Sequence, residues 1–160
     1  MNVKGKVALV TGGASGIGRA TSLLLAEHGA QVVVADIAID GAAETVNLIE
    51  KNGGEALSIA ADISQVDAVE QLFAAGEARF GGIDIVINNA GIVVGPPGWP
   101  QVGAARLAQV IHTNLGGVFI VQRTALDSFA KRGGGVVVNT SSQAALVPLP
   151  TDPDYGAAKA

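Results

Sequence analysis

The chain has 160 residues, about the length of one domain, and 49% of them are hydrophobic, which is enough to form a buried core. Its net charge of −4 is spread without runs of either sign, so nucleic acid and anionic membranes are not expected partners. Cysteine is absent, which excludes disulfides and thiolate chemistry, and no apolar run is long enough for a membrane span or a signal peptide, so we expect a cytoplasmic protein.

The first segments of the chain form a strand, a glycine-rich turn, a helix, a second strand and an acidic residue. Gly29 stands where the C-cap of this helix is expected. The order and the length are typical of a dinucleotide-binding βαβ unit. The segments are Val7–Val10, Thr11–Gly18, Ile17–His28, Gln31–Ala35 and Asp36.

The glycines of the turn have separate physical roles. Gly12 allows the sharp exit from the strand, and Gly16 and Gly18 let a pyrophosphate and the first helical turn approach the backbone, because no Cβ intervenes. The helix that starts near Ile17 points its free N–H groups and the positive end of its dipole at the phosphates. The spacing, Gly-x3-Gly-x-Gly, differs from Gly-x-Gly-x-x-Gly, and glycines alone also fit a plain tight turn. The two strands and the terminal acid favour the nucleotide site.

Asp36 predicts which dinucleotide binds. Its carboxylate would accept hydrogen bonds from the hydroxyls of the adenosine ribose. A 2′-phosphate there would meet like charge, and no Arg or Lys occurs in the residues that follow, Ile37-Ala-Ile39. We therefore expect NAD as the cofactor rather than NADP.

Helical and strand patterns continue to alternate after Asp36. Ser64 is a candidate N-cap for one of the helices. The alternation predicts an α/β fold: a Rossmann-type doubly wound parallel sheet with strand order 3-2-1-4-5, in one domain of residues 1–160. The ligand crevice is expected at the carboxyl ends of strands 1 and 4. The further helices are Gly41–Asn52, Gln65–Phe80 and Arg106–Lys131, and the further strands are Ala56–Ala60, Ile83–Ile87 and Val136–Thr140.

Two segments after the fourth strand border this crevice. In Asn88-Asn-Ala-Gly91, small residues let a ribose and a nicotinamide lie against the backbone, and asparagine side chains can join neighbouring strands; a plain strand-ending turn is the alternative. Val93–Pro100 is a loop by its prolines and glycines, and Trp99 is either a loop anchor, which we favour, or part of a substrate wall. His28 and His112 are far apart, and we interpret both as ordinary helix residues, so no metal site is expected.

A serine, a tyrosine and a lysine follow the fifth strand. Asn139-Thr-Ser-Ser142 ends that strand on the ligand side, and Tyr155, the only tyrosine, is followed four residues later by Lys159. Positions i and i+4 of a helix share a face, so the phenol and the ammonium would project together toward the crevice. A nearby ammonium stabilises phenolate, which would let Tyr155 exchange a proton with an alcohol or carbonyl oxygen. The Tyr-x3-Lys spacing carries little information without the serine and the nucleotide site.

Taken together, these motifs resemble the short-chain dehydrogenase/reductase family over essentially the whole chain. Thr11–Gly18 is similar to the family's cofactor turn, Asp62 to its adenine-contacting acid and Asn88–Gly91 to its sheet-stabilising motif. Asn114, in His112-Thr-Asn-Leu-Gly116, is similar to the family's structural and catalytic asparagine.

The resemblance implies a mechanism that fits the residue chemistry. Tyr155 would take the hydroxyl proton as hydride passes to nicotinamide, or donate it in the reverse direction. Ser142 would hydrogen-bond the substrate oxygen, Lys159 would bind the nicotinamide ribose, and Asn114 would hold a water that links Lys159 to solvent. Ser141 is the alternative serine, and the thirteen-residue interval to Tyr155 selects Ser142 by resemblance.

The implied function is the NAD-dependent interconversion of a small-molecule secondary alcohol and its ketone. Two alternatives stay open. One is an NADPH-linked 3-oxoacyl thioester reductase, which Asp36 disfavours, and the other is a catalytically silent nucleotide-binding fragment. The implied catalytic residues are Asn114, Ser142, Tyr155 and Lys159, and the implied substrate contacts are Ser142, Gln143 and Tyr155. The implied cofactor contacts are Gly12, Ser15, Gly16, Ile17, Gly18, Asp36, Ile37, Asp62, Ile63, Asn89, Ala90, Gly91, Tyr155 and Lys159.

The chain stops one residue after Lys159, whereas members of this family are usually longer, so we expect the fold to lack its last strands. Val136–Asn139 would then be an unprotected edge strand. The resemblance also implies a homo-oligomer, a tetramer or dimer, that forms in the full-length protein through the long helix and the helix of Tyr155, most of which is missing here. The substrate is not readable, but Ile92–Val94 and the apolar segment Gln143–Pro150 suggest an apolar pocket wall, where Gln143 either orients a substrate or is a satisfied loop residue.

Overall fold

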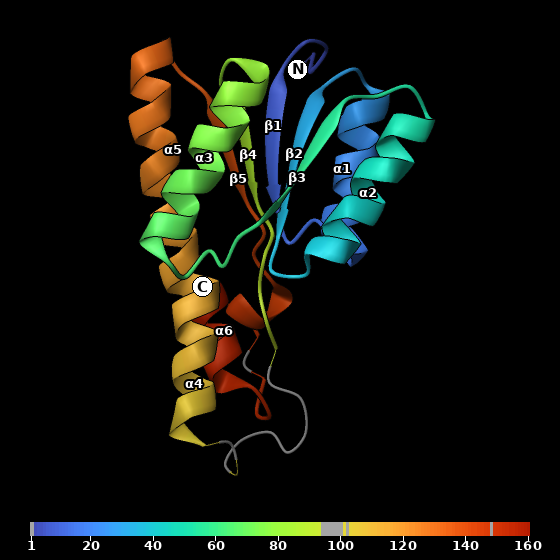
Figure 1. Cartoon of the computed structure of the whole chain (residues 1–160). Coiled ribbons are helices and arrows are strands. Elements are labelled where there is room, and N and C mark those ends of the chain that lie inside the picture. Colours follow the sequence, from blue (N-terminus) through green and yellow to red (C-terminus); the bar gives the residue numbers. More distant parts are fainter. Residues whose placement is uncertain (1, 94–100, 102, 148) are drawn as a thin grey trace.

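The structure is a computed structural model that describes residues 2–93, 101, 103–147 and 149–160. Five parallel strands form one sheet in the order β3-β2-β1-β4-β5 (Figure 1). The predicted Rossmann-type α/β fold and its strand order are therefore confirmed. The strands are β1 (Val7–Thr11), β2 (Gln31–Asp36), β3 (Ala56–Ala60), β4 (Ile85–Asn88) and β5 (Val136–Asn139).

Helices cover both faces of the sheet, and each face has its own apolar core (Figure 1). Successive side chains of a strand point to opposite faces, so Val10 and Val34 pack with the first pair of helices while Leu9 and Val33 pack with the second. Strands buried on both faces have to be apolar throughout, which is why they appear as continuous hydrophobic runs in the sequence. The first pair is α1 (Gly16–Glu27) and α2 (Ile39–Lys51), and the second is α3 (Val66–Phe80) and α5 (Val118–Arg132).

The long helix predicted at 106–131 is not uniform. It consists of α4 (Ala104–Ile111), a π-helical segment (His112–Gly117) and α5, which follow one another directly. Gly117 is buried in the π-helical segment, where a Cβ would lie 2.7 Å from Ile63 Cγ1. The wider turn thus lets the helix backbone pass close to the segment that follows β3. Single π-helical turns of this kind occur frequently at functional sites.

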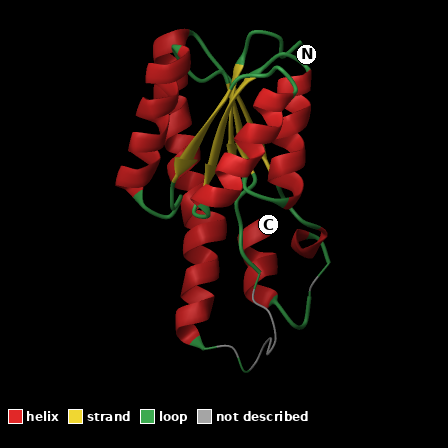
Figure 2. Cartoon of the chain, turned by 45° about the vertical axis from the view of Figure 1, so that its right-hand side comes forward, coloured by secondary structure: helices red, strands yellow, loops and turns green. Residues whose placement is uncertain are grey.

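Three short elements lie beyond the carboxyl edge of the sheet (Figure 2). They are α4, the 3-10 turn Gln143–Ala145 and α6 (Pro153–Lys159). The crevice is predicted at this same edge, so these elements are placed to carry the residues that surround it.

The predicted N-cap of α3 is wrong. Gln65 precedes the first helical residue, Val66, and makes no side-chain cap bond. Ser64 instead turns back, and its Oγ and its N–H both donate to Asp62 Oδ1, at 2.7 and 2.9 Å. The turn between β3 and α3 is therefore stabilised by the side chain of Asp62 rather than by a serine N-cap.

Two other boundaries move because aspartates bind backbone groups. α2 begins two residues earlier than predicted, since Asp36 Oδ1 accepts the N–H of Ala38 at 2.9 Å and turns the chain directly into the helix. β4 begins two residues later than predicted. Asp84, which precedes it, uses its side chain to accept the N–H of Val7 at 2.9 Å.

Some predictions fall on residues outside the described ranges. Apart from Val93, the predicted loop Val93–Pro100 is among them, and so is Trp99. Within the described residues, no helix combines the length and the apolarity needed to cross a bilayer. The same residues contain no cluster of His, Asp and Glu that could hold a metal ion.

Candidate active site

The glycine turn lies at the carboxyl end of β1, against the exit of β4. Gly12 has a φ of +67°, and a Cβ at this position would lie 2.8 Å from Ala90 Cα. A Cβ on Gly18 would collide with the carbonyl oxygen of Gly12. Both glycines are therefore required for the close packing of the turn on α1 and on the segment after β4.

The start of α1 fits the phosphates of a dinucleotide. Ser15, Gly16 and Ile17 are exposed, and Ile17 has 68% of its surface accessible. Ser15 is the N-cap residue, but its side chain makes no cap bond to a described residue. A Cβ on Gly16 would meet no atom within 4 Å, so the space above the turn is open. The first N–H groups of α1 can therefore bind an anion from this side.

Backbone N–H groups bind both side-chain oxygens of Asp36 and so fix the orientation of its carboxylate. Oδ2 accepts the N–H of Ala14 in the glycine turn at 3.0 Å, and Oδ1 accepts the N–H of Ala38 at 2.9 Å. Each carboxylate oxygen keeps a further acceptor position, so the side chain can still receive two ribose hydroxyls. Ile37 beside it is 72% exposed. The residues present thus fit an adenosine ribose.

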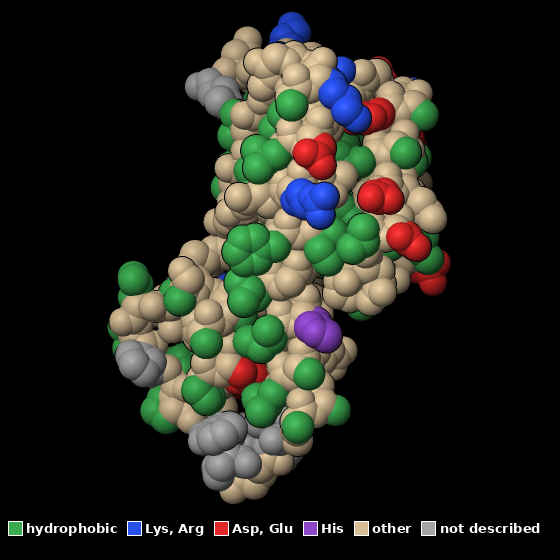
Figure 3. All heavy atoms as spheres, turned by 90° about the vertical axis from the view of Figure 1, so that its left-hand side faces the viewer, with side chains coloured by type: hydrophobic (Ala, Val, Ile, Leu, Met, Phe, Trp, Pro, Cys, Tyr) green, Lys and Arg blue, Asp and Glu red, His purple; other side chains and the backbone are tan. Residues whose placement is uncertain are grey.

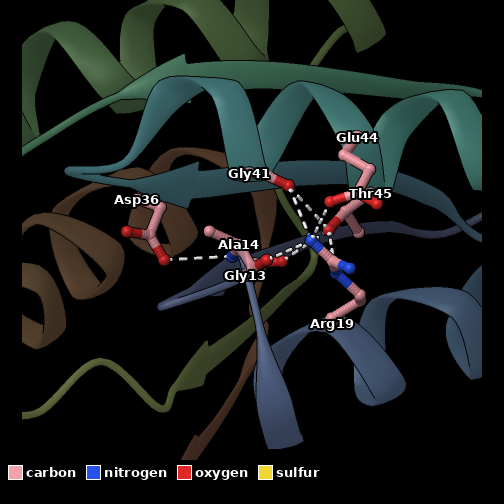
Figure 4. A network of polar contacts seen from close by, with 7 residues as sticks. All are labelled: Gly13, Ala14, Arg19, Asp36, Gly41, Glu44 and Thr45. Atoms are coloured by element: carbon pink, nitrogen blue, oxygen red, sulfur yellow. Dashed lines mark hydrogen bonds and ion pairs between the residues drawn. The ribbon is translucent and has the colours of Figure 1, made fainter.

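Arg19 belongs to the same network, and the sequence analysis missed it (Figure 4). Its Nη2 donates to Ala14 O at 2.5 Å and pairs with Glu44 Oε2 at 2.7 Å, and its Nε donates to Thr45 Oγ1 at 3.0 Å. Thr45, which is fully buried, in turn donates to Gly13 O at 2.9 Å. An arginine in the first turn of α1 was the available signal, but its acidic partner lies 25 residues away on another helix.

Two asparagines at the end of β4 join three strands, as the sequence predicted. Asn88 Nδ2 donates to Asn139 Oδ1 on β5 at 2.9 Å. Asn89 Nδ2 donates to Thr11 O on β1 at 3.1 Å, and the N–H groups of Asn89 and Ala90 donate to Thr11 Oγ1 at 3.0 and 3.1 Å. The side chain of Asn89 therefore ties the start of the glycine turn to the segment that follows β4.

The residues expected around the adenine differ in their surroundings. Asp62 is exposed, and its Oδ1 is occupied by the two bonds to Ser64. Ile63 is only 5% exposed, and its side chain belongs to the core that packs against Gly117. A direct contact with adenine, if made here, would fall to Asp62 Oδ2 and to the backbone of this segment.

Lys159 reaches from α6 to the sheet. Its Nζ donates to the carbonyl oxygen of Thr140, just after β5, at 3.0 Å. A Cβ on Gly91 would lie 3.4 Å from the same Nζ, so the ammonium sits between the ends of β4 and β5. Desolvation by partial burial lowers the pKa of Lys159 from its ordinary value.

Tyr155 shares α6 with this lysine, one helical turn earlier. Its ring is half-buried in an apolar cluster with Val110 and Ala158, and Ile92 packs against the same cluster. Packing from α4 and from the segment after β4 therefore restricts the ring, although α6 has only seven residues.

The two candidate serines have different hydrogen bonds. Ser141 Oγ donates its proton to Lys159 O at 2.8 Å, which ties the end of β5 to α6. Ser142 Oγ accepts the N–H of Ala144 at 3.2 Å, so its own proton stays available to a substrate oxygen. Gln143 is exposed on the following 3-10 turn. This difference favours Ser142 on geometry that is independent of sequence spacing.

Asn114 is 2% exposed in the π-helical segment. Its Oδ1 accepts the N–H of Ile92 and its Nδ2 donates to Ile92 O, both at 2.7 Å. This reciprocal pair fixes the backbone after β4, close to the lysine. A water held by the side chain of Asn114 would have to share these two atoms, each of which keeps one further hydrogen-bonding position.

Comparison with known proteins agrees with this arrangement. Residues 6–160 match the short chain dehydrogenase family. The chain is 41% identical, over 99% of its length, to 3beta-hydroxysteroid dehydrogenase 1 of Eggerthella lenta, and 38% identical, over 97%, to cis-4-hydroxycyclohexanecarboxylate dehydrogenase of Sinomonas cyclohexanicum. A short-chain type dehydrogenase/reductase from Mycobacterium marinum superposes with a TM-score of 0.93 at 32% identity, covering 99% of this chain and 65% of that one.

The chain spans 61% and 62% of the length of the two curated relatives. Over that span the strand order, the glycine turn and the Tyr-x3-Lys helix occur together. The chain belongs to the short-chain dehydrogenase family.

Proposed function

We propose that the protein is an NAD-dependent oxidoreductase that interconverts a secondary alcohol and its ketone, with Tyr155 as the general acid and base. The observation that carries this proposal is the position of Lys159, whose ammonium lies at the ends of β4 and β5. The glycine turn and Asp36 lie at the ends of β1 and β2, along the same edge of the sheet. A dinucleotide bound along this edge would extend from the carboxylate to the ammonium.

Each site residue would have a distinct task. Bound NAD would supply hydride transfer at its nicotinamide. Tyr155 would accept the substrate hydroxyl proton, or return it to the ketone oxygen, and Ser142 would donate a hydrogen bond to that same oxygen. Lys159 would bind the nicotinamide ribose and favour the ionised form of the phenol. Asn114 would act as a positioning residue, because it fixes the backbone of Ile92.

A ring alcohol is the proposed substrate class. The two curated relatives are named for hydroxyl groups carried on ring systems. In this chain the segment that follows Ser142 carries accessible apolar side chains: Leu146 is 87% exposed and Val147 is 52% exposed. Such surfaces would bury a hydrocarbon ring favourably. Gln143 is the polar side chain available there to orient it.

We also propose that the protein forms a homo-oligomer through the long helix. Leu115, Phe119 and Leu126 are exposed on one side of this helix, with Phe119 64% accessible. Figure 3 shows that side of the molecule, where hydrophobic side chains gather. Several large apolar side chains exposed on one face of a helix are typical of an interaction site.

The test is Tyr155→Phe, which removes one oxygen and keeps the ring in its apolar cluster. We expect kcat to fall by at least about a hundredfold, the usual contribution of a general acid or base. The dissociation constant for NADH, measured by cofactor fluorescence, should stay within a few-fold. An equal loss of NADH binding would show that the tyrosine is structural. Titration of the wild type with NADPH tests the cofactor: tighter binding than NADH would favour the 3-oxoacyl thioester reductase.

A further inference from the structure

The network around Ala14 links a cation to the predicted ribose site (Figure 4). Ala14 donates its N–H to Asp36 Oδ2 at 3.0 Å and accepts Arg19 Nη2 on its carbonyl oxygen at 2.5 Å. The guanidinium and the carboxylate therefore bind opposite ends of one residue in the glycine turn. A phosphate on the 2′-oxygen of a ribose held by Asp36 would come close to both groups.

Arg19 would be a suitable partner for such a phosphate if it were free. A guanidinium is always protonated, and it presents several donors in a plane that suits phosphate oxygens. The arginine side chain is 26% exposed, so solvent does not fully screen its charge. Glu44 is the acidic group that neutralises it, at 2.7 Å from Nη2.

We propose that Glu44 is a specificity-determining residue that prevents Arg19 from serving a 2′-phosphate. Asp36 repels the 2′-phosphate directly, and Glu44 cancels the positive charge that would compensate for this repulsion. Glu44 acts through Arg19 and is therefore a positioning residue. The inference rests on the proposed function in one respect, namely that the cofactor binds along the glycine turn with its ribose at Asp36.

The experiment compares Glu44→Gln with Asp40→Asn, in the wild-type and in the Arg19→Gln background. Both substitutions remove one negative charge from an exposed residue of α2 while keeping its shape, but among the described residues only Glu44 pairs with Arg19. The measured quantity is the ratio of the dissociation constants of NADH and NADPH, obtained by cofactor fluorescence. NADH binding by each variant also reports that it is folded.

Glu44→Gln should shift this ratio toward NADPH by about two- to fivefold, the range expected for an ion pair that is partly exposed. The shift should disappear in the Arg19→Gln background, whereas any effect of Asp40→Asn should be the same in both backgrounds. A shift for Glu44→Gln that persists without Arg19 overturns the proposal. If the Arg19→Gln proteins do not bind NADH, the two substitutions are compared in the wild-type background alone. Equal shifts of the ratio for Glu44→Gln and Asp40→Asn then overturn the proposal, and a larger shift for Glu44→Gln supports it.

A wild type that prefers NADPH would contradict the proposed NAD dependence without affecting this comparison. The comparison of the single and double variants measures how each substitution changes the ratio of the NADH and NADPH dissociation constants relative to its parent protein. Its result therefore does not depend on which cofactor the parent prefers. The failure of the proposed function and the failure of the inference are thus distinguishable.

Discussion

Two neighbouring glycines of the π-helical segment should respond in opposite ways to the addition of a methyl group. A Cβ on Gly116 would have Ile111 O, at 3.8 Å, as its nearest described neighbour. A Cβ on Gly117 would lie 2.7 Å from Cγ1, 2.8 Å from Cδ1 and 3.2 Å from the backbone carbon of Ile63. Ile63 is buried in the main core, so its side chain has little room to move away.

The magnitude follows from two contributions. Replacing Gly by Ala in a helix stabilises it by about 0.8–1 kcal/mol, and both variants gain this amount. Inserting a methyl into a packed core costs about 1–3 kcal/mol, and only Gly117→Ala bears this cost. Gly116→Ala should therefore raise the free energy of unfolding by about 1 kcal/mol. Gly117→Ala should have a free energy of unfolding about 1–3 kcal/mol below that of Gly116→Ala.

Urea denaturation followed by circular dichroism measures this difference, with the m-value as a check that both variants unfold alike. In thermal unfolding, the same difference corresponds to a midpoint for Gly117→Ala about 3–10 °C below that of Gly116→Ala. Adding Ile63→Val to Gly117→Ala removes Cδ1 and should recover part of the loss. Equal stabilities of the two alanine variants would refute the reasoning, because they would mean that Ile63 does not pack on Gly117.

Three further predictions concern the end of the sheet. Ser142→Ala should lower kcat by about a hundredfold or more, whereas Ser141→Ala should cost about 1 kcal/mol of stability and leave turnover nearly unchanged; the reverse pattern in steady-state kinetics would exchange their roles. Asn139→Ala should destabilise the fold by about 1–3 kcal/mol in urea unfolding, because Asn88, which is 1% exposed, loses its acceptor; no change would mean that the pair is not formed. Since burial lowers the pKa of Lys159, its charged form costs stability at neutral pH, and this cost is released as pH rises from the lowered pKa to the ordinary one. The unfolding free energy of the wild type relative to Lys159→Met should therefore rise with pH across that window, and a falling difference would contradict the desolvation.

The fold was predictable because its signals are local. Each apolar run lies within one short window, and each helix of the first half has a glycine one or two residues after its last residue. Gly81 shows why this works: its φ of +84° ends α3 in a left-handed conformation that glycine adopts without strain. Strand order then followed from the handedness of the crossovers, which is nearly invariant.

What could not be predicted depends on contacts between distant segments. The π-helical turn forms where Gly117 meets Ile63 and where Asn114 meets Ile92, and neither contact lies within a window that defines a helix. The choice of Ser64 as an N-cap failed for a local reason, because the Asp62 carboxylate accepts both the N–H and the Oγ–H of Ser64 and holds this serine in the turn before the helix. Motif spacing proposed the residues of the candidate site, but it carried no information on the hydrogen bonds that separate Ser141 from Ser142.

Ala14 shows how contacts between distant segments complicate the interpretation of cofactor preference. It carries only a methyl group, and no pattern marks it, yet its N–H and its carbonyl oxygen are bound by Asp36 and Arg19. Replacing Asp36 by a small residue would remove the carboxylate and also release the N–H of Ala14, so a gain in NADPH binding would combine a charge effect with a change in the turn. Asp36→Asn separates the two, because its amide oxygen can still accept that N–H while the negative charge is lost. If charge alone sets the preference, Asp36→Asn should shift it as far as a substitution by alanine does, and a smaller shift would assign the remainder to the shape of the turn.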